Sequence, residues 1–319
     1  MSAIQKVLIV DDVHQSLVFG LISNNFDVYY MPDIKANEIA EFIQKENIEG
    51  LVIRSKLFLN EAFFSQCSTL IWVARGGAGM DNIDEDAAFR SGVALMNSEN
   101  ANSDAVGEQT LAMLLALRTN LVKAHNEVSK GIWDREGNRG IELKGKTVGI
   151  IGYGNTGKAV CEKLSGFGVK ILVYDKYKSK FSDTNLTEVN LDEILAKSDV
   201  ISLHIPLNSE TENFVNDDFI NRVSKPFVLL NLSRGKVVDI QSVMKFLKTG
   251  KIVGFAADVL PNEPINLSND FDNKMLQTLN LYSNVLLTPH VGGWTIESYE
   301  KISEILLINI LKYNNIIVN

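Results

Sequence analysis

One of the four histidines, His290, lies where it could exchange a proton with a bound small molecule. It follows the apolar run Val285–Thr288 and Pro289, and two glycines, Gly292 and Gly293, come soon after it. An imidazole accepts and donates protons near neutral pH, and open α/β sheets bind their ligands at the carboxyl ends of parallel strands. The pattern indicates an acid/base, with a structural histidine at a strand end as the alternative.

An arginine and a glutamate follow two further predicted strands. Arg234 comes after Phe227–Asn231, and Glu263 comes after Gly254–Asp258. Because the carboxyl ends of parallel strands lie at one edge of their sheet, we expect both side chains at the same edge as the imidazole of His290. Each alone is commonly a structural or solvated charge. Together with a dinucleotide-binding loop they would form a site for hydride transfer.

Such a loop is present at Gly152–Gly157, where Gly-Tyr-Gly-Asn-Thr-Gly matches the pattern G-x-G-x-x-G. It directly follows the apolar run Thr147–Ile151, and a helical pattern continues over Asn155–Phe167. The first glycine permits a tight turn, the second lets the backbone approach a pyrophosphate, and the third lets the helix pack close to the strand. The N–H groups at the helix N-terminus then attract the anion. This context favours a dinucleotide site over a chance glycine-rich turn.

The kind of dinucleotide is indicated by Asp175, which ends the next predicted strand, Lys170–Tyr174. A carboxylate there accepts hydrogen bonds from the adenosine ribose hydroxyls and repels a 2′-phosphate, so NAD is expected rather than NADP. Lys176 and Lys178 lie close by in the sequence and work against that preference. A surface aspartate after a turn is the alternative reading.

Short apolar runs alternate with amphipathic stretches, which predicts strands and helices in turn. In the first hundred residues we expect strands at Val7–Val10, Val28–Tyr30, Leu51–Ile53, Leu70–Ala74 and Val93–Met96, with helices near His14–Ser23, Ala36–Lys45 and Asn60–Gln66. We then expect six strands, at Thr147–Ile151, Lys170–Tyr174, Val200–Leu203, Phe227–Asn231, Gly254–Asp258 and Val285–Thr288, with helices at Asn155–Phe167, Leu191–Ala196 and Ile240–Thr249. Each series predicts a parallel sheet covered on both faces.

Two longer helices are expected on either side of the second series. One runs unbroken from about Asp104 to Lys130, and the other, Thr295–Tyr313, packs back on the first domain. A chain of 319 residues is also too long for one typical core. The predicted fold class is α/β, with two Rossmann/flavodoxin-like parallel-sheet domains and a cleft between them. The expected boundaries are 1–101 plus 291–319 for a discontinuous substrate domain and 102–290 for an NAD-binding domain.

Composition and charge narrow the classes of partner. The hydrophobic content of 45% and charged content of 22% are ordinary for a globular protein. A net charge of −8 argues against nucleic acid as a partner. Cys67 and Cys161 show no metal-ligand spacing, so we expect no metal site and a reducing, cytoplasmic location. No apolar run approaches the roughly 18 residues that a spanning helix needs, so no membrane partner is expected.

Taken together, these motifs resemble the D-isomer-specific 2-hydroxyacid dehydrogenases over nearly the whole chain. The matching segments are Gly152–Gly157, Leu203–Pro206, Asn231–Gly235, Asp258–Pro264 and Thr288–Gly293. The resemblance implies a substrate domain built from both termini, a central NAD domain, and a homodimer in which the NAD domains pair. The cofactor contacts that it implies are Gly152, Tyr153, Gly154, Asn155, Thr156, Gly157, Asp175, His204, Pro206, Asn231, Ser233, Asp258, Gly292 and Gly293.

The resemblance also implies a catalytic set of Arg234, Glu263 and His290 acting on a small 2-hydroxy or 2-keto acid. His290 would exchange a proton with the substrate oxygen while a hydride moves to or from the nicotinamide. Glu263 would hydrogen-bond the other ring nitrogen and orient the imidazole. Arg234 would bind the substrate carboxylate with the two arms of its guanidinium and polarise the neighbouring carbonyl.

A glycine-rich loop of the first domain bears on the substrate. In the family this loop helps to bind the substrate carboxylate through backbone N–H groups, and the role falls here on Gly77 and Ala78. Arg54 and Arg75 end strands of the same domain and could bind a second anion, as in phosphoglycerate dehydrogenases; structural ion pairs are the alternative. The specific expectation is 3-phosphoglycerate/3-phosphohydroxypyruvate, in serine biosynthesis. A chain ending at Asn319 would be a short, serine-insensitive form.

Other readings stay open. The substrate could be an unphosphorylated acid such as glyoxylate or hydroxypyruvate. The protein could also be a non-catalytic NAD-sensing regulator, because fold alone does not fix function. A formate dehydrogenase is disfavoured because it would carry Gln in place of Glu263. The segment Ile265–Asn284 is longer than is usual between the Glu and His motifs and is expected to reshape one wall of the site.

Overall fold

The computed structural model describes residues 4–316. The chain divides into two compact units: unit 1 comprises Met1–Asn102 with Trp294–Asn319, and unit 2 comprises Ser103–Gly293. Residues 1–3 and 317–319, which the predicted substrate domain includes, lie outside the described residues. Both units are built on a sheet of parallel strands, which confirms the predicted fold class.

The sheet of unit 1 has the strand order β2-β1-β3-β4-β5 among the described residues. Every neighbouring pair is parallel, and β1 lies between β2 and β3, with Val7 opposite both Val28 and Gly50. This is the flavodoxin-like order, in which the strand order reverses between β1 and β3. The strands are β1 (Lys6–Ile9), β2 (Asp27–Tyr30), β3 (Gly50–Ile53), β4 (Trp72–Arg75) and β5 (Ala94–Asn97).

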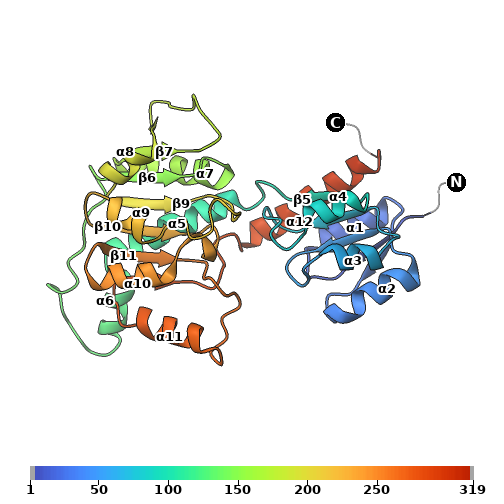
Figure 1. Cartoon of the computed structure of the whole chain (residues 1–319), viewed down its shortest axis with the longest axis horizontal. Coiled ribbons are helices and arrows are strands. Elements are labelled where there is room, and N and C mark those ends of the chain that lie inside the picture. Colours follow the sequence, from blue (N-terminus) through green and yellow to red (C-terminus); the bar gives the residue numbers. More distant parts are fainter. Residues whose placement is uncertain (1–3, 317–319) are drawn as a thin grey trace. The chain divides into compact units, whose positions relative to one another are not determined.

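Helices cover both faces of this sheet because its strands are apolar on both sides. One face packs Val7, Ile9 and Trp72 against α1 (Gln15–Ser23) and α12 (Ile296–Tyr313). In Figure 1 the red helix α12 lies beside α1 and β5, although almost two hundred residues separate it from the rest of its unit. The other face is covered by α2 (Ile39–Glu46), α3 (Glu61–Gln66) and α4 (Glu85–Arg90), and the short helix η1 (Ala36–Glu38) leads into α2.

The sheet of unit 2 has the order β12-β11-β10-β9-β6-β7-β8 within the described residues, again all parallel. Its first strand in sequence, β6, lies between β7 and β9, so the order reverses there as in a dinucleotide-binding sheet. The strands are β6 (Thr147–Ile151), β7 (Lys170–Tyr174), β8 (Leu186–Glu188), β9 (Val200–Leu203), β10 (Phe227–Asn231), β11 (Ile252–Ala257) and β12 (Val285–Leu287).

Two layers of helices bury the faces of the larger sheet (Figure 1). On one face, Val148, Ile150 and Val228 pack against α5 (Ser103–Arg118), α7 (Asn155–Leu164) and η2 (Ser165–Phe167). The opposite face packs on α8 (Leu191–Lys197), α9 (Asp217–Arg222), η3 (Gly235–Val237), α10 (Ile240–Lys248) and α11 (Asp270–Leu279). No helix in the described part of the chain is long and apolar enough to cross a bilayer.

Two sequence-based expectations for unit 2 are wrong. The long helix expected from Asp104 to Lys130 is two helices, α5 and α6 (Leu121–Val128), because Asn120 between them adopts the left-handed conformation with φ 55°. The expected six strands are seven among the described residues, since β8 adds to the edge beside β7. The predicted strand boundaries otherwise differ by at most two residues, as at β4 and β11.

Replacing Asn120 with Ala tests the helix break. In a continuous helix this change would stabilise the protein, because Ala is the better helix former. At a left-handed residue the change to Ala is expected to lower the free energy of unfolding by about 1–2 kcal/mol. The Cβ of Ala would clash with the backbone, and Ala has no side-chain hydrogen bond to offset that clash. The side chain of Asn120 also donates to the Arg139 carbonyl at 3.3 Å.

The midpoint of urea unfolding measures this effect, and Asn120→Gly serves as the control. Gly loses the same side-chain hydrogen bond but adopts the left-handed conformation freely, so it should be more stable than the Ala variant. An Ala variant as stable as the parent protein would contradict the assigned break.

Candidate active site

The imidazole of His290 is joined to the carboxylate of Glu263. The His290 Nδ1 and Glu263 Oε2 atoms lie 2.5 Å apart, with the side chains 51% and 32% exposed. Glu263 is itself held, because its Oε1 accepts the Leu260 N–H at 2.6 Å. Within residues 4–316 nothing bonds the other ring nitrogen, Nε2, so that nitrogen remains for proton exchange with a ligand. The structure thus brings together two of the three predicted catalytic side chains.

The backbone of His290 is held by Asp258, which directly follows β11 and is 3% exposed. The Asp258 carbonyl accepts the His290 N–H at 2.8 Å, and its carboxylate accepts the Thr288 hydroxyl at 2.5 Å and the N–H groups of Val291 and Gly292 at 2.9 and 2.7 Å. His290 has φ 54°, a conformation that a residue with a side chain adopts at a cost of about 1–2 kcal/mol. Asp258 therefore fixes the backbone of residues 288–292, which includes the strained His290 and sets the orientation of its imidazole.

That positioning contact is one that the sequence reasoning missed, since it treated Asp258 only as a cofactor contact. The available signal was an aspartate that directly ends a strand of buried residues, because a buried carboxylate requires donors nearby. Gly292 belongs to the same arrangement: a Cβ at this position would lie 2.8 Å from the Asp258 Oδ2. The glycine is thus needed for the close approach of its backbone to the carboxylate.

Arg234 lies on the next loop along the same sheet edge, after β10. Its backbone carbonyl accepts the Asn231 side-chain amide at 3.0 Å, and its Nη1 donates to the Ser233 carbonyl at 2.8 Å. Gly235 packs so tightly on the Leu260 carbonyl that a Cβ would lie 2.0 Å from that oxygen. The loops that carry Arg234 and Glu263 are therefore in direct contact. Asn231 also accepts the Ser233 N–H and hydroxyl, at 3.1 and 2.8 Å, which orders this loop.

The glycine-rich loop follows β6, where the strand order of the sheet reverses. Gly152 has φ 98°, and a Cβ there would lie 2.3 Å from the His204 carbonyl oxygen; a Cβ at Gly157 would lie 2.1 Å from the Gly152 carbonyl oxygen. Gly154 is the N-cap residue of α7, and a Cβ added there would have no atom within 4 Å. Since glycine has no side chain, the first N–H groups of α7 receive no side-chain cap from it. The N-terminus of α7, including Asn155 and Thr156, is thus open to an anion, as a pyrophosphate requires. These features fit a dinucleotide.

Asp175 follows β7 beside this loop. One carboxylate oxygen accepts the Tyr153 N–H at 2.7 Å, and the other accepts the N–H groups of Tyr177 and Lys178, each at 2.9 Å. Partial burial opposes ionisation, but these three N–H groups and the Lys178 charge outweigh it and lower the pKa of Asp175. The carboxylate is therefore charged at neutral pH, as an acceptor for ribose hydroxyls must be.

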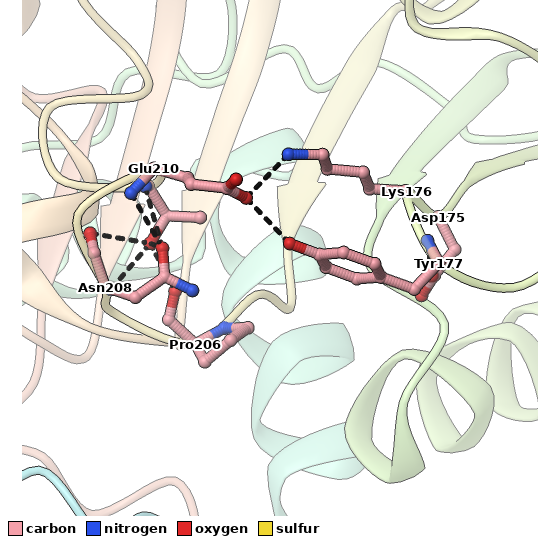
Figure 2. A network of polar contacts seen from close by, with 7 residues as sticks. Asp175, Lys176, Tyr177, Pro206, Asn208 and Glu210 are labelled. Atoms are coloured by element: carbon pink, nitrogen blue, oxygen red, sulfur yellow. Dashed lines mark hydrogen bonds and ion pairs between the residues drawn. The ribbon is translucent and has the colours of Figure 1, made fainter.

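Both lysines next to Asp175 are engaged. Lys178 Nζ donates to the Tyr153 carbonyl at 3.0 Å. Lys176 Nζ donates to the carboxylate of Glu210 at 2.6 Å, and the same oxygen accepts the Tyr177 hydroxyl at 2.7 Å, as Figure 2 shows. Glu210 comes from the loop after β9, a contact that no sequence pattern indicated. The two lysines that were expected to oppose a preference for NAD are thus held by other groups.

The same loop after β9 also carries His204 and Pro206, two of the predicted cofactor contacts. His204 is 7% exposed; its Nε2 lies 2.8 Å from the Ser202 hydroxyl and its Nδ1 has no hydrogen-bond partner in the described residues. Burial lowers the pKa of His204 to about 4. The Pro206 carbonyl accepts the Thr211 hydroxyl at 2.6 Å, which shapes the loop. His204 is therefore neutral near pH 7, so it can contribute packing to this part of the site but no positive charge.

The predicted substrate residues of unit 1 lie at the carboxyl ends of β3 and β4. The Arg54 guanidinium stacks 3.9 Å from the centroid of the Trp294 ring, and its Nη1 donates to the Asp12 carbonyl at 3.4 Å. A Cβ at Gly77, which has φ 151°, would overlap the Arg75 guanidinium. The Gly77 N–H donates to the Arg75 carbonyl at 2.9 Å.

The other loop residue, Ala78, is more accessible. It is exposed, and within the described part of the chain its N–H has no acceptor, while its carbonyl accepts the Asn97 side chain at 2.9 Å. Of the two predicted N–H donors, Ala78 is therefore the one that remains for a ligand. For residues 4–316, no cluster of three or more His, Cys, Asp or Glu side chains is arranged to hold a metal ion.

Because His204 is buried, we expect the free energy of unfolding to fall at acidic pH. Its pKa falls from 6.5 to about 4 on folding, so between these values the unfolded chain binds a proton that the folded chain does not. Stability from this group is complete above pH 6.5 and is lost as the pH falls toward 4. Between pH 7 and pH 5 the loss is expected to be about 2 kcal/mol.

Urea unfolding at the two pH values measures this loss, and His204→Gln should remove most of it. His125→Gln, a change at an exposed histidine, should leave it unchanged. Equal acid sensitivity in the parent protein and the His204 variant would contradict the assignment.

Comparison with known proteins places these features in a family. Residues 111–292 match the model of the D-isomer specific 2-hydroxyacid dehydrogenase NAD-binding domain. The chain is 33% identical to D-3-phosphoglycerate dehydrogenase of Haemophilus influenzae over 97% of its own length and 75% of that protein. It is 35% identical to glyoxylate reductase of Thermofilum pendens, over 73% of its length and 68% of the relative.

A solved structure agrees with these matches. The D-lactate dehydrogenase of Aquifex aeolicus, complexed with NAD and lactic acid, superposes with a TM-score of 0.82 at 26% identity, covering 98% of this chain and 96% of that one. The family match spans the glycine-rich loop, Arg234, Glu263 and His290. The chain therefore belongs to the D-isomer specific 2-hydroxyacid dehydrogenase family and is an NAD-dependent enzyme that acts on the CH–OH group of hydroxy acids.

Proposed function

We propose that this dehydrogenase interconverts 3-phosphoglycerate and 3-phosphohydroxypyruvate. The observation that carries the proposal is the place of Arg54, directly after β3 at the point where the strand order of unit 1 reverses. Open α/β sheets bind ligands at such points, and a guanidinium is the side chain best suited to a phosphate. Arg75 ends the adjacent strand, β4, and the similarity to a D-3-phosphoglycerate dehydrogenase over almost the whole chain supports the same substrate.

The proposed chemistry assigns one role to each catalytic side chain. Bound NAD supplies the hydride acceptor or donor at its nicotinamide ring. His290 Nε2 takes the hydroxyl proton during oxidation and returns it during reduction. Glu263, bonded to Nδ1 at 2.5 Å, keeps the imidazole in one orientation and stabilises its protonated form. Arg234 binds the substrate carboxylate through two parallel hydrogen bonds and polarises the adjacent carbonyl.

The residues proposed to hold NAD surround the reversal point of unit 2. N–H groups at the start of α7 bind the pyrophosphate, Asp175 accepts from the ribose hydroxyls, and His204 with Pro206 shapes the adenine side. At the other end of the edge, Asn231, Ser233, Gly292 and Gly293 are proposed to contact the nicotinamide half. Asp258 acts there by positioning the His290 segment. Ala78, with Gly77, is proposed to contribute to substrate binding through its backbone N–H.

Variants of His290 and Arg234 should separate the roles of the two residues. His290→Ala is expected to lower kcat by about 10²–10⁴-fold, because it removes the acid/base, while the Kd for NADH stays within about twofold. Arg234→Lys keeps the charge but loses the paired geometry, so it should raise KM for the keto acid about tenfold or more.

Steady-state kinetics and NADH fluorescence titration check both outcomes. His125→Ala provides a control for loss of an imidazole from the surface. An Arg234→Lys enzyme with the parent KM would refute bidentate binding, and a His290→Ala enzyme with the parent kcat would refute the proton-transfer role.

A second candidate is an unphosphorylated acid such as glyoxylate or hydroxypyruvate. The specific observation in its favour is the negative charge beside Arg54. Asp11 accepts the Arg54 N–H at 2.6 Å, and the Asp12 carboxylate accepts the hydroxyls of Tyr30 and Tyr299 at 2.9 and 2.8 Å. These carboxylates reduce the local positive charge that a phosphate dianion requires. The match to a glyoxylate reductase supports this alternative.

An NADH-oxidation screen decides between the candidates. We expect kcat/KM for 3-phosphohydroxypyruvate to exceed the values for pyruvate, glyoxylate and hydroxypyruvate at least tenfold. Arg54→Gln should lower it about tenfold or more, because it removes a charge-assisted hydrogen bond, and should affect hydroxypyruvate about twofold at most. Lys35→Gln, at an exposed lysine of the same unit, controls for net charge.

Higher activity on an unphosphorylated acid would overturn the phosphoglycerate proposal in favour of that acid. No turnover of any acid, with NADH binding intact, would favour an NAD-sensing regulator. Neither result would contradict the proposed NAD site of unit 2, because NADH binding is measured independently of the substrate.

We also propose a cytoplasmic homodimer, with a role in serine biosynthesis if the phosphorylated substrate is confirmed. Support for the dimer comes from apolar side chains on and after α6 that are exposed in the single chain. Leu121, Val128 and Trp133 are 61%, 54% and 79% exposed. A surface of this kind is commonly covered by a partner. Light scattering of the protein in solution measures its mass and tests the dimer.

A further inference from the structure

Two loops of unit 2 are joined by one carboxylate. Glu210, in the loop after β9, accepts hydrogen bonds from Lys176 Nζ at 2.6 Å and from the Tyr177 hydroxyl at 2.7 Å, both in the loop after β7 (Figure 2). The pair with Lys176 raises the pKa of the lysine and lowers that of the glutamate, so both groups are charged at neutral pH. Lys176 directly follows Asp175, the proposed ribose acceptor.

The loop that carries Glu210 is ordered by its own hydrogen bonds. The Asn208 side-chain oxygen accepts the N–H groups of Glu210 and Thr211 at 2.9 and 3.1 Å, and the Thr211 hydroxyl donates to the Pro206 carbonyl at 2.6 Å. Such Asx turns fix the backbone of a short segment. The carboxylate of Glu210 is therefore presented from a defined position, although its side chain is exposed.

The chemistry that separates NADP from NAD is a single phosphate on the adenosine ribose. A lysine beside the ribose acceptor would attract that dianion, and a carboxylate would repel it. The neighbourhood of Asp175 contains two lysines, so Asp175 alone leaves the balance of charge positive. Lys178 is held on the Tyr153 carbonyl at 3.0 Å and contributes to the low pKa of Asp175. Lys176 is the remaining cation, and Glu210 holds it.

We propose that Glu210 is a specificity-determining residue that disfavours NADP by pairing with Lys176, which keeps the ammonium group away from a 2′-phosphate at the adenosine end of the cofactor site. This inference rests on the proposed role of Asp175 in binding the ribose. Removing the charge of Glu210 would release Lys176 toward a 2′-phosphate. Because the pair is exposed, its loss should affect overall stability little, which makes the substitution a clean test.

The experiment is calorimetric titration of the full chain with two fragments, ADP-ribose and 2′-phospho-ADP-ribose. In Glu210→Gln, the affinity for 2′-phospho-ADP-ribose should increase about 5- to 20-fold, the range expected for one partly exposed charge-assisted hydrogen bond. The affinity for ADP-ribose should change less than about threefold. Raising the salt concentration should reduce the gain, since exposed charges are screened.

Two further variants test the mechanism. Glu212→Gln removes the same charge two positions away, from an exposed side chain that has no ion-pair partner in the described residues, and should leave the affinity for 2′-phospho-ADP-ribose unchanged. Adding Lys176→Met to Glu210→Gln should abolish the gain. A corresponding shift in the ratio of kcat/KM for NADPH and NADH would follow from the binding result.

Three outcomes would overturn the inference: no gain in Glu210→Gln, an equal gain in Glu212→Gln, or a gain that persists without Lys176. Failure of the underlying ribose assignment gives a different result. It would appear as unchanged ADP-ribose affinity in Asp175→Ala, whatever the Glu210 variants do.

Discussion

The carboxylate of Asp258 organises the sheet edge that carries His290, the proposed acid/base. It lies at the end of β11 and accepts hydrogen bonds from Thr288, Val291 and Gly292, while its backbone carbonyl accepts from His290. A buried carboxylate is costly unless its oxygens are satisfied, so the segment that supplies its donors is tightly constrained. That constraint holds His290 in its left-handed conformation. The hydrogen bonds to Asp258 offset this strain. In the resulting conformation, the imidazole of His290 lies within hydrogen-bonding distance of Glu263.

The same edge shows how a parallel sheet assembles a site from distant parts of a chain. The strands β10, β11 and β12 are neighbours, so the loops with Arg234, Glu263 and His290 leave the sheet side by side. The loops after β6, β7 and β9 continue along the edge and carry most of the residues proposed to bind the cofactor. Contacts between loops then refine the arrangement: Gly235 packs on the Leu260 carbonyl, and Glu210 joins Lys176 and Tyr177. Strand order brings the residues together, and these contacts fix their orientation.

Continuous apolar strands were the most predictable part of the fold. The strands β6, β7, β9 and β10 match their predicted bounds because nearly every residue in them is apolar and turn residues follow. The strand β8 was missed because it has three residues, of which only Leu186 is buried. The break at Asn120 was missed because apolar residues continue at helical spacing on both sides. The segment Ile265–Asn284 holds the polar helix α11, which packs through Met275 and Leu279 on the core of unit 2.

The residues proposed for the site could be named where the chemistry requires a particular side chain, as for His290 as the acid/base and the glycines of the phosphate loop. The loop-ordering contacts of Asp258 and Asp175 were not predicted, because no sequence pattern shows which backbone N–H groups a carboxylate will accept. Asp258 and Asp175 resemble each other physically: each follows a strand and accepts three hydrogen bonds on its carboxylate, mostly from backbone N–H groups. Both shape a loop through the hydrogen bonds that their carboxylates accept. Asp175 is also the proposed acceptor for the ribose hydroxyls, so one carboxylate would both order a loop and select a ligand.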